Sequence, residues 1–358
     1  MGGCEVRRTP FGAARDGTAV DLYLLRNAAG MEVEIATYGA IVVALRVPDR
    51  DGNIEDVVLG YPSLDGYLVN NSPFFGAMVG RYANRIASGE LVLDGVSYAL
   101  PRNDGANHLH GGPGGFHARV WSASARSAPG LAAVELSRTS PDGEEGYPGN
   151  LTVALTFSLG EANELAIDCE ARTDRTTVCN VAHHGYFDLE AGAAGDVLGH
   201  LFTVNAQRFT PVDRGFIPTG ELRPVAGTPM DFTRPTPLGA RIDAPYDQLR
   251  LGPGGYDHNY VLDGGGPGLA LAARVVGPRR GRVLEVLTTE PGMQLYAGNF
   301  LDGSITGKGG RVYGRRTGFC LETQHFPDSP HHPKFPSTAL RPGETYRTRT
   351  VYRFGVER

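Results

Sequence analysis

The chain has 358 residues, of which 41% are hydrophobic and 20% are charged, and its formal net charge is −5. A chain this apolar buries enough surface to offset its ordering entropy, which excludes an intrinsically disordered protein. There is no basic excess to neutralise phosphates and no apolar run near the roughly 20 residues of a membrane span, so neither nucleic acid nor a membrane is an expected partner.

The N-terminal residues carry no apolar stretch of the kind found in signal peptides, which predicts a cytoplasmic protein. We expect residues 1–9 to form a short extension and residues 10–356 to form the core. The cysteines are far apart and include no CxxC pair, which favours small buried thiols over disulfides or a zinc site. We therefore expect no metal; the cysteines are Cys4, Cys169, Cys179 and Cys320.

Alternation of apolar and polar residues predicts strands in several parts of the chain. The first lies at 31–37, and a short helix of one or two turns is predicted at 61–68. Residues 151–159 and 165–171 alternate so regularly that they predict a hairpin with one buried face. Further strands are predicted at 269–275, where Leu269, Leu271, Ala273 and Val275 alternate, and at 346–354.

Glycine and proline, 50 and 25 residues, gather between these runs. They are typical of turns that join short strands. No stretch of about 12 residues holds a helical period, and we find no repeat and no proline-rich linker. The sequence therefore predicts an all-β protein with few short helices. We expect a single domain over residues 1–358, built as one large antiparallel β-sandwich whose concave face suits a small-molecule site.

Polar clusters interrupt the apolar pattern in a few places. Glu322 is the sharpest candidate, because a carboxyl group directly after an apolar strand tends to lie where burial raises its pKa. His108 and His110 have the spacing of metal ligands but no third ligand nearby, so a metal site is not predicted. The simplest interpretation makes Arg81 and Arg85 surface charges. By the same reasoning, the histidines at 331–332 are solvated loop residues.

Ten segments in order resemble the aldose 1-epimerase (galactose mutarotase) family over residues 10–354. They are YGA at 38–40, PDRDG at 48–52, EDVVLG at 55–60, GRYANRIASG at 80–89, HLHGG at 108–112, HHGYFDL at 183–189, YDHNYVL at 256–262, TTEPGMQLYAGNFLDG at 288–303, GFCLETQHFPD at 318–328 and FPSTALRPGETY at 335–346.

The resemblance implies a galactose mutarotase-like supersandwich. It also implies an enzyme that interconverts the α and β anomers of free aldohexoses, such as glucose and galactose, without a cofactor. General acid–base chemistry suffices: a base takes the O1 proton, an acid protonates the ring oxygen, and the opened ring recloses on the other face. By the resemblance, Glu322 is the base and His184 the acid, and the sugar-binding residues are Asn84, Arg85, His110, Tyr186, Asp257 and Gln294.

The chain departs from the family pattern without losing the implied acid or base. The departures are His183, Gly185 and Asp188 where the family has NHSYFNL, Glu290 where it has TTQPG, and His325 and Phe326 where it has ETQNWPD. His183 and Glu290 add titratable groups, which we expect to bear on pH dependence or sugar preference.

Three alternatives stay open at this stage. A glycoside hydrolase or lyase would pair Glu322 with Asp257 or Glu290, since hydrolysis normally needs two carboxyl groups. A hexose-6-phosphate 1-epimerase would bind the phosphate through Arg81 or Arg85. A non-catalytic sugar-binding protein would keep only the pocket. In each case the expected partner is a small sugar, and the chain is expected to be a monomer or a homodimer.

Overall fold

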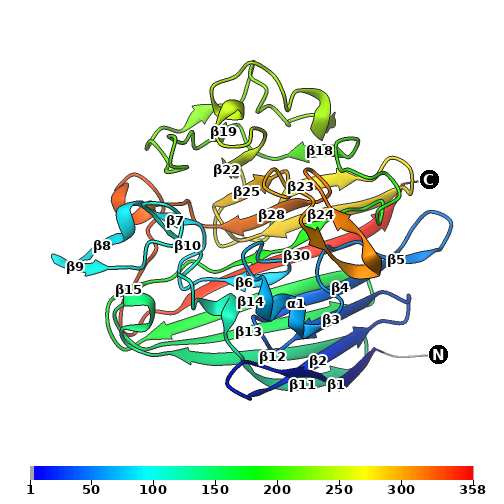
Figure 1. Cartoon of the computed structure of the whole chain (residues 1–358), viewed down its shortest axis with the longest axis horizontal. Coiled ribbons are helices and arrows are strands. Elements are labelled where there is room, and N and C mark those ends of the chain that lie inside the picture. Colours follow the sequence, from blue (N-terminus) through cyan, green and yellow to red (C-terminus); the bar gives the residue numbers. More distant parts are fainter. Residues whose placement is uncertain (1–3, 358) are drawn as a thin grey trace.

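A nine-stranded antiparallel sheet forms the largest layer of the computed structural model, which describes residues 4–357 (Figure 1). The C-terminal strand, red in Figure 1, runs through the middle of this sheet. In spatial order the strands are β11 (Ser122–Ala128), β12 (Leu131–Ser140), β13 (Leu151–Gly160), β14 (Glu164–Thr173), β30 (Tyr346–Val356), β24 (Arg282–Thr288), β23 (Ala270–Val276), β18 (Leu201–Val204) and β21 (Thr236–Pro237).

Two further antiparallel sheets pack with it. The five-stranded sheet, blue in Figure 1, consists of β1 (Glu5–Ala13), β2 (Ala19–Arg26), β3 (Glu32–Ala36), β4 (Ile41–Pro48) and β5 (Ile54–Asp56). The six-stranded sheet, which positions the site, consists of β17 (Tyr186–Phe187), β28 (Phe319–Gln324), β25 (Gly292–Tyr296), β22 (Asp257–Val261), β19 (Arg208–Phe209) and β20 (Arg223–Pro224).

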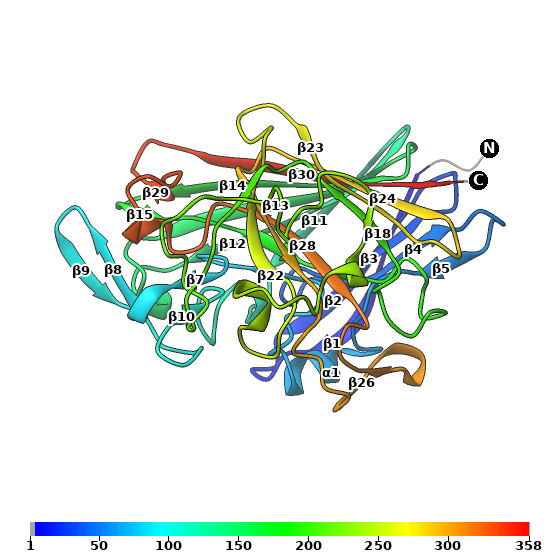
Figure 2. The ribbon, with the colours of Figure 1, turned by 90° about the horizontal axis from the view of Figure 1, so that it is seen from above.

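The remaining strands form two-stranded ladders, of which β8–β9 projects from the body of the molecule (Figure 2). These pairs are β6 (Ala77–Val79) with β16 (Ala182–His184), β7 (Arg85–Ile86) with β10 (His108–Leu109), β8 (Glu90–Leu93) with β9 (Val96–Ala99), β15 (Thr177–Val178) with β29 (Ala339–Leu340), and β26 (Ile305–Thr306) with β27 (Val312–Tyr313).

Helices are few and short, as predicted. Within residues 4–357 the α-helical segment is α1 (Leu64–Val69), close to the predicted 61–68, and none of the helices is long and apolar enough to cross a bilayer. The 3₁₀ turns are η1 (Ala87–Gly89), η2 (Phe116–Ala118), η3 (Glu144–Gly146), η4 (Leu238–Ala240), η5 (Gln248–Arg250), η6 (Lys308–Gly310) and η7 (Ser329–His331).

The predicted hairpin at 151–171 is confirmed as β13–β14, where Leu151 pairs with Thr173 and Leu159 with Leu165. Its alternate side chains are fully buried because one face of the nine-stranded sheet packs on the core. One cluster of buried residues joins the three large sheets and includes Val33, Phe157 and Leu321. Burying side chains of this kind contributes about 1.5–3 kcal/mol each, so the layers stabilise one another.

Two expectations about the strands need correction. The predicted strand at 269–275 exists as β23, but a bulge between Leu271 and Ala273 shifts its register and leaves Leu269 and Leu271 on the exposed side. The segment expected as an N-terminal extension contributes to the fold, since Glu5–Ala13 pairs along β2 as an edge strand. Residues 1–3 lie outside the described residues.

Candidate active site

A cavity of about 390 Å³ opens beside the six-stranded sheet and brings together most of the predicted site residues. Its walls come from β28, β16, β22 and the loops around residues 70–74, 104–110 and 300–305. The predicted residues that line it are Asn84, Arg85, His110, His184, Tyr186, Asp257 and Glu322.

Glu322 enters the cavity from β28, where side chains alternate between the two faces of the sheet. It is 2% exposed, and its Oε2 has no hydrogen-bond partner among the described residues. Burial raises the pKa of Glu322 well above its ordinary value, and the nearby charge of Asp257 raises it further. This carboxyl group is therefore protonated more easily than an exposed one and has an oxygen free for a ligand.

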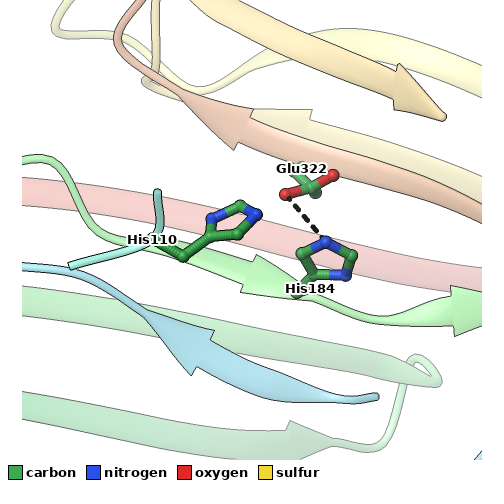
Figure 3. A group of neighbouring side chains, drawn as sticks. All are labelled: His110, His184 and Glu322. Carbon is green, nitrogen blue, oxygen red and sulfur yellow. Dashed lines mark ion pairs between the residues drawn. The ribbon is translucent and has the colours of Figure 1, made fainter. Parts of the chain in front are cut away.

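His184 faces Glu322 from β16, a strand that packs against β28 (Figure 3). Its Nε2 lies 3.6 Å from Oε2 of Glu322, and its ring stacks on Tyr186 at 5.2 Å between centroids. Burial lowers the pKa of His184 to about 3. The raised carboxyl pKa and the lowered imidazole pKa favour the uncharged form of the pair, in which its one shared proton is on Glu322, over the ion pair in which that proton is on His184.

His110 lies beside His184, with ring centroids 5.1 Å apart (Figure 3). Its Nδ1 accepts a hydrogen bond of 3.1 Å from the backbone N–H of Asn84. A neutral imidazole carries one proton, so Nε2 of His110 is an N–H donor. Burial lowers the pKa of His110 well below its ordinary value, and the charge of His184 adds to this effect, which keeps the ring neutral.

The hydrogen bond from Asn84 to His110 decides how well His110, His184 and Glu322 suit a metal ion. Potential ligand atoms of His110, His184 and Glu322 lie within 4.8 Å of one another. On His110, however, Nδ1 already uses its lone pair on the Asn84 N–H, and Nε2 carries the proton. Binding a metal would therefore require the loss of that hydrogen bond. The set fits donation of a hydrogen bond to an oxygen atom better than coordination.

Two ionic groups complete the polar wall of the cavity. Arg85 is buried, and its Nε donates to Asp104 at 2.7 Å, so its interpretation as a surface charge is wrong. Asp257 accepts a hydrogen bond of 2.7 Å from the side-chain amide of Gln294. Gln294 itself does not line the cavity, so the structure places this predicted sugar contact behind Asp257, where it orients the carboxylate.

Arg81 is also buried, but its guanidinium points away from the cavity. It donates to the backbone carbonyl groups of Pro148 and Gly149 at 2.9 Å and of Ser140 at 3.0 Å. The expectation of a surface charge is therefore wrong for Arg81 as well. A guanidinium enclosed by carbonyl groups holds three chain segments together and is not available to a ligand.

The histidines outside the cavity have structural partners. His108 is fully buried between the carbonyl oxygen of Pro101, 2.7 Å from Nδ1, and the hydroxyl of Tyr147, 2.6 Å from Nε2. His108 and His110 therefore do not act as a pair. His331 is exposed, as predicted, whereas His332 is half-buried, and both imidazoles flank the buried carboxylate of Asp328.

The sequence reasoning missed several residues of the cavity, among them Phe74, Asp104 and Phe300. Phe74 has a left-handed backbone (φ +58°), and its ring contacts His110 at 4.7 Å between centroids. Asp104 holds Arg85, and Phe300 lies on the rim with 55% of its surface exposed. Phe74 and Asp104 stand outside the quoted family segments, and Phe300 lies within the segment 288–303 without a group that suggests chemistry. Only the turn-forming residues before Phe74 and around Asp104 marked these segments as loops.

Comparisons with known proteins agree with this geometry. The sequence model described as aldose 1-epimerase matches residues 21–353. The chain belongs to the aldose 1-epimerase family. It is 44% identical to a galactose mutarotase of Rattus norvegicus, over 98% of this chain and 99% of the rat protein. It is 38% identical to an aldose 1-epimerase of Escherichia coli strain K12, over 96% and 98% of the two chains.

The fold of the family is equally clear. The crystal structure of a galactose 1-epimerase from Lactobacillus acidophilus NCFM superposes with a TM-score of 0.87 at 28% identity, covering 99% of this chain and 100% of that one. The predicted all-β sandwich of the galactose mutarotase type is confirmed. The chain is an isomerase of this family, as its full-length relatives are.

Proposed function

We propose that this enzyme interconverts the α and β anomers of free aldohexoses, such as glucose and galactose, with Glu322 and His184 as its base and acid. The observation that carries the proposal is the buried pair of these residues, 3.6 Å apart in a polar cavity. One carboxyl group and one imidazole are sufficient for the reaction, because each step moves a proton to or from a sugar oxygen.

The ring opens when Glu322 takes the proton of the anomeric hydroxyl and His184 gives a proton to the ring oxygen. The C1–O5 bond breaks, the C1–C2 bond rotates, and the reverse transfers close the ring with C1 inverted. The sugar hydroxyl fills the free position at Oε2 of Glu322. After opening, Glu322 is protonated and His184 is neutral, which is the state that burial favours. His110 and Arg85 hold sugar oxygens in place as hydrogen-bond donors.

The cavity gives little support to a phosphorylated substrate. Its lining carries the carboxyl groups of Asp104, Asp257, Asp302 and Glu322. The charge of Arg85 is balanced by Asp104, and Arg81 is enclosed elsewhere. A phosphate dianion would therefore meet net negative charge. Glycoside hydrolysis is not favoured either, since Glu290 lies outside the cavity and Asp257 is engaged by Gln294.

Polarimetry of freshly dissolved sugars tests this function. We expect catalytic amounts of enzyme to accelerate the mutarotation of α-D-glucose and α-D-galactose. Under the same conditions we expect the mutarotation of glucose 6-phosphate to be accelerated only weakly. We expect no release of reducing sugar from methyl α-D-galactoside, which has no free anomeric hydroxyl. Faster turnover of the phosphate, or hydrolysis of the glycoside, would replace the proposal with the corresponding alternative. Binding of sugar without acceleration would indicate a sugar-binding protein.

The proposal also covers the compartment and the oligomeric state in which the enzyme works. We infer a cytoplasmic enzyme that works as a single domain, either alone or as a homodimer, without a membrane or nucleic acid. Cys169, Cys179 and Cys320 are free and buried, as predicted, whereas Cys4 is free but only half-buried, and free thiols suit a reducing compartment. The net charge of −5 supports the exclusion of nucleic acid. Light scattering of the purified chain will distinguish monomer from dimer.

A further inference from the structure

One strand supplies a partner for each ring nitrogen of His184. Glu322 and Cys320 are two residues apart on β28, so their side chains project from the same face. Oε2 of Glu322 lies 3.6 Å from Nε2, and Sγ of Cys320 lies 3.7 Å from Nδ1. In Figure 3 the nitrogen that does not face Glu322 points away from it. Cys320 is fully buried and Glu322 nearly so.

We propose that Cys320 is a positioning residue for this reaction, whose thiol holds Nδ1 of His184 so that Nε2 stays aimed at Glu322 and the substrate. The inference rests on the proposed function, because it assigns His184 the task of carrying a proton. Nδ1–H donates to Sγ in the neutral imidazole and equally in the imidazolium. The contact therefore persists while the proton on Nε2 comes and goes.

The aromatic packing around His184 does not fix which ring nitrogen faces Glu322, and the contact with Cys320 can do so. Tyr186 stacks on the ring at 5.2 Å and Phe74 lies tilted to it at 5.7 Å, but ring packing does not distinguish one nitrogen from the other. Among residues 4–357, Cys320 supplies the side-chain atom within hydrogen-bonding distance of Nδ1, while the ring also has a backbone hydrogen bond within His184 itself. The register supports the arrangement, since Cys320 is paired directly with Tyr186 across the ladder between β28 and β17.

A thiol differs from the usual partner of a working histidine. A carboxylate at Nδ1 orients the ring but also stabilises the imidazolium. Burial raises the pKa of Cys320 well above its ordinary value, so this partner is neutral. It orients the ring without adding charge beside a carboxyl group that must also change its charge. The other titratable groups that face the ring or stand close to it are Glu322, Tyr186, His110, His117 and His183.

The test compares Cys320→Ala and Cys320→Ser with Cys179→Ala, a matched loss of a buried thiol outside the cavity. We expect Cys320→Ala to lower kcat about 10-fold, the lower end of the loss seen when a metal-bound histidine loses its hydrogen-bond partner, with little change in KM. Cys320→Ser keeps a small partner that accepts a hydrogen bond and should retain most of the activity. Cys179→Ala should change neither kinetic parameter.

Two further readouts separate positioning from a merely structural role. The ¹⁵N spectrum of His184 should show the Nδ1–H tautomer in the wild-type enzyme and a mixture in Cys320→Ala. Cys320→Asp should move the acid limb of the kcat/KM profile to higher pH, because a carboxylate at Nδ1 raises the pKa of His184. Wild-type kcat and an unchanged ¹⁵N spectrum in Cys320→Ala would overturn the inference. Absence of mutarotation in the wild-type enzyme would instead refute the proposed function, which the ¹⁵N experiment does not depend on.

Discussion

Residues 4–357 contain two close pairs of a glutamate and a histidine, each with a buried carboxyl group, and the pKa shifts of the two pairs run in opposite directions. Glu322 and His184 stand 3.6 Å apart in the cavity, while Glu290 and His325 are joined outside it by a hydrogen bond of 2.6 Å. Both carboxyl groups are at most 2% exposed. Burial alone therefore does not decide the behaviour of a buried carboxyl group, and its neighbours do.

Glu290 is surrounded by donors. It accepts from His325 and from the hydroxyl of Tyr346 at 2.9 Å. Burial raises the pKa of Glu290, but the charge and hydrogen bond of His325 outweigh it and leave the pKa below its ordinary value. Burial lowers the pKa of His325, yet Glu290 raises it above its ordinary value. This pair is ionised and satisfied, whereas Glu322 faces the like charge of Asp257 and keeps an oxygen free for the substrate.

The departures from the family pattern lie outside the cavity, and most of them have structural partners. Glu290 and His325 replace the expected Gln and Asn together and bond to each other. His183 and Gly185 are coupled as well, because a Cβ on Gly185 would lie 2.6 Å from Cε1 of His183. Asp188 pairs with Arg311 at 3.1 Å. None of the six departures, Phe326 included, lines the cavity.

The largest expected effect separates the two glutamates by activity. Glu322→Gln should lower kcat for mutarotation by about 10² to 10⁴-fold, the usual contribution of a general base. Glu290→Gln should leave kcat within about twofold, because Glu290 does not reach the cavity. Polarimetry with galactose compares the two variants directly. Equal losses would show that the cavity pair has no special role in the reaction.

Stability should separate the glutamates in the opposite sense. Glu290→Gln should cost about 3 kcal/mol of unfolding free energy, because it breaks a buried pair. The raised pKa of His325 stabilises the folded protein at pH values below about 6.5, the pKa of histidine in the unfolded chain. This stabilisation is lost as pH rises through the pKa of His325 in the folded protein. The lowered pKa of Glu290 stabilises the folded protein at pH values above about 4.3, the pKa of glutamate in the unfolded chain. This stabilisation is lost as pH falls through the pKa of Glu290 in the folded protein.

The cost of Glu290→Gln should therefore be greatest between about pH 4.3 and 6.5 and smaller at pH 9. Urea unfolding at pH 6 and pH 9 measures the difference. Glu322→Gln is the control and should be neutral or stabilising, since it removes an unsatisfied carboxyl group. A larger cost at pH 9 than at pH 6 would contradict the ionised state of the pair.

The like charge of Asp257 is the next point of difference. Asp257→Asn should lower the pKa of Glu322, because the charge of Asp257 raises it. The pair works with one shared proton, which Glu322 loses at high pH, so the alkaline limb of the kcat/KM profile should move to lower pH. In our proposal Asp257 also accepts a hydrogen bond from a sugar hydroxyl, and losing it, at about 2 kcal/mol, should lower kcat/KM about 30-fold. A pH profile of initial rates checks both effects. An alkaline limb that stays in place would mean that burial alone sets the pKa of Glu322.

Much of the architecture could be predicted because alternation along strands follows from burial of one face, as at 151–171. Glu322 and His184 could be predicted because their segments resemble the family. Other features depend on the fold in three dimensions. The bulge beside Leu271 reverses the side-chain alternation, the left-handed backbone of His110 separates it from His108, and the carbonyl groups around Arg81 come from distant segments.

We expect the smallest effect when Glu290 and His325 are both replaced by the residues of the family pattern, Gln and Asn. Glu290→Gln and His325→Asn should each destabilise the protein, since each leaves a buried group without its ionic partner. The double variant removes both charges at once and supplies two amide side chains that can bond to each other. It should lie within about 1 kcal/mol of the wild-type enzyme, because a neutral replacement of a whole buried pair costs little. A double-mutant cycle in urea measures this coupling. Costs that simply add would show that Glu290 and His325 are stabilised by other neighbours and not by each other.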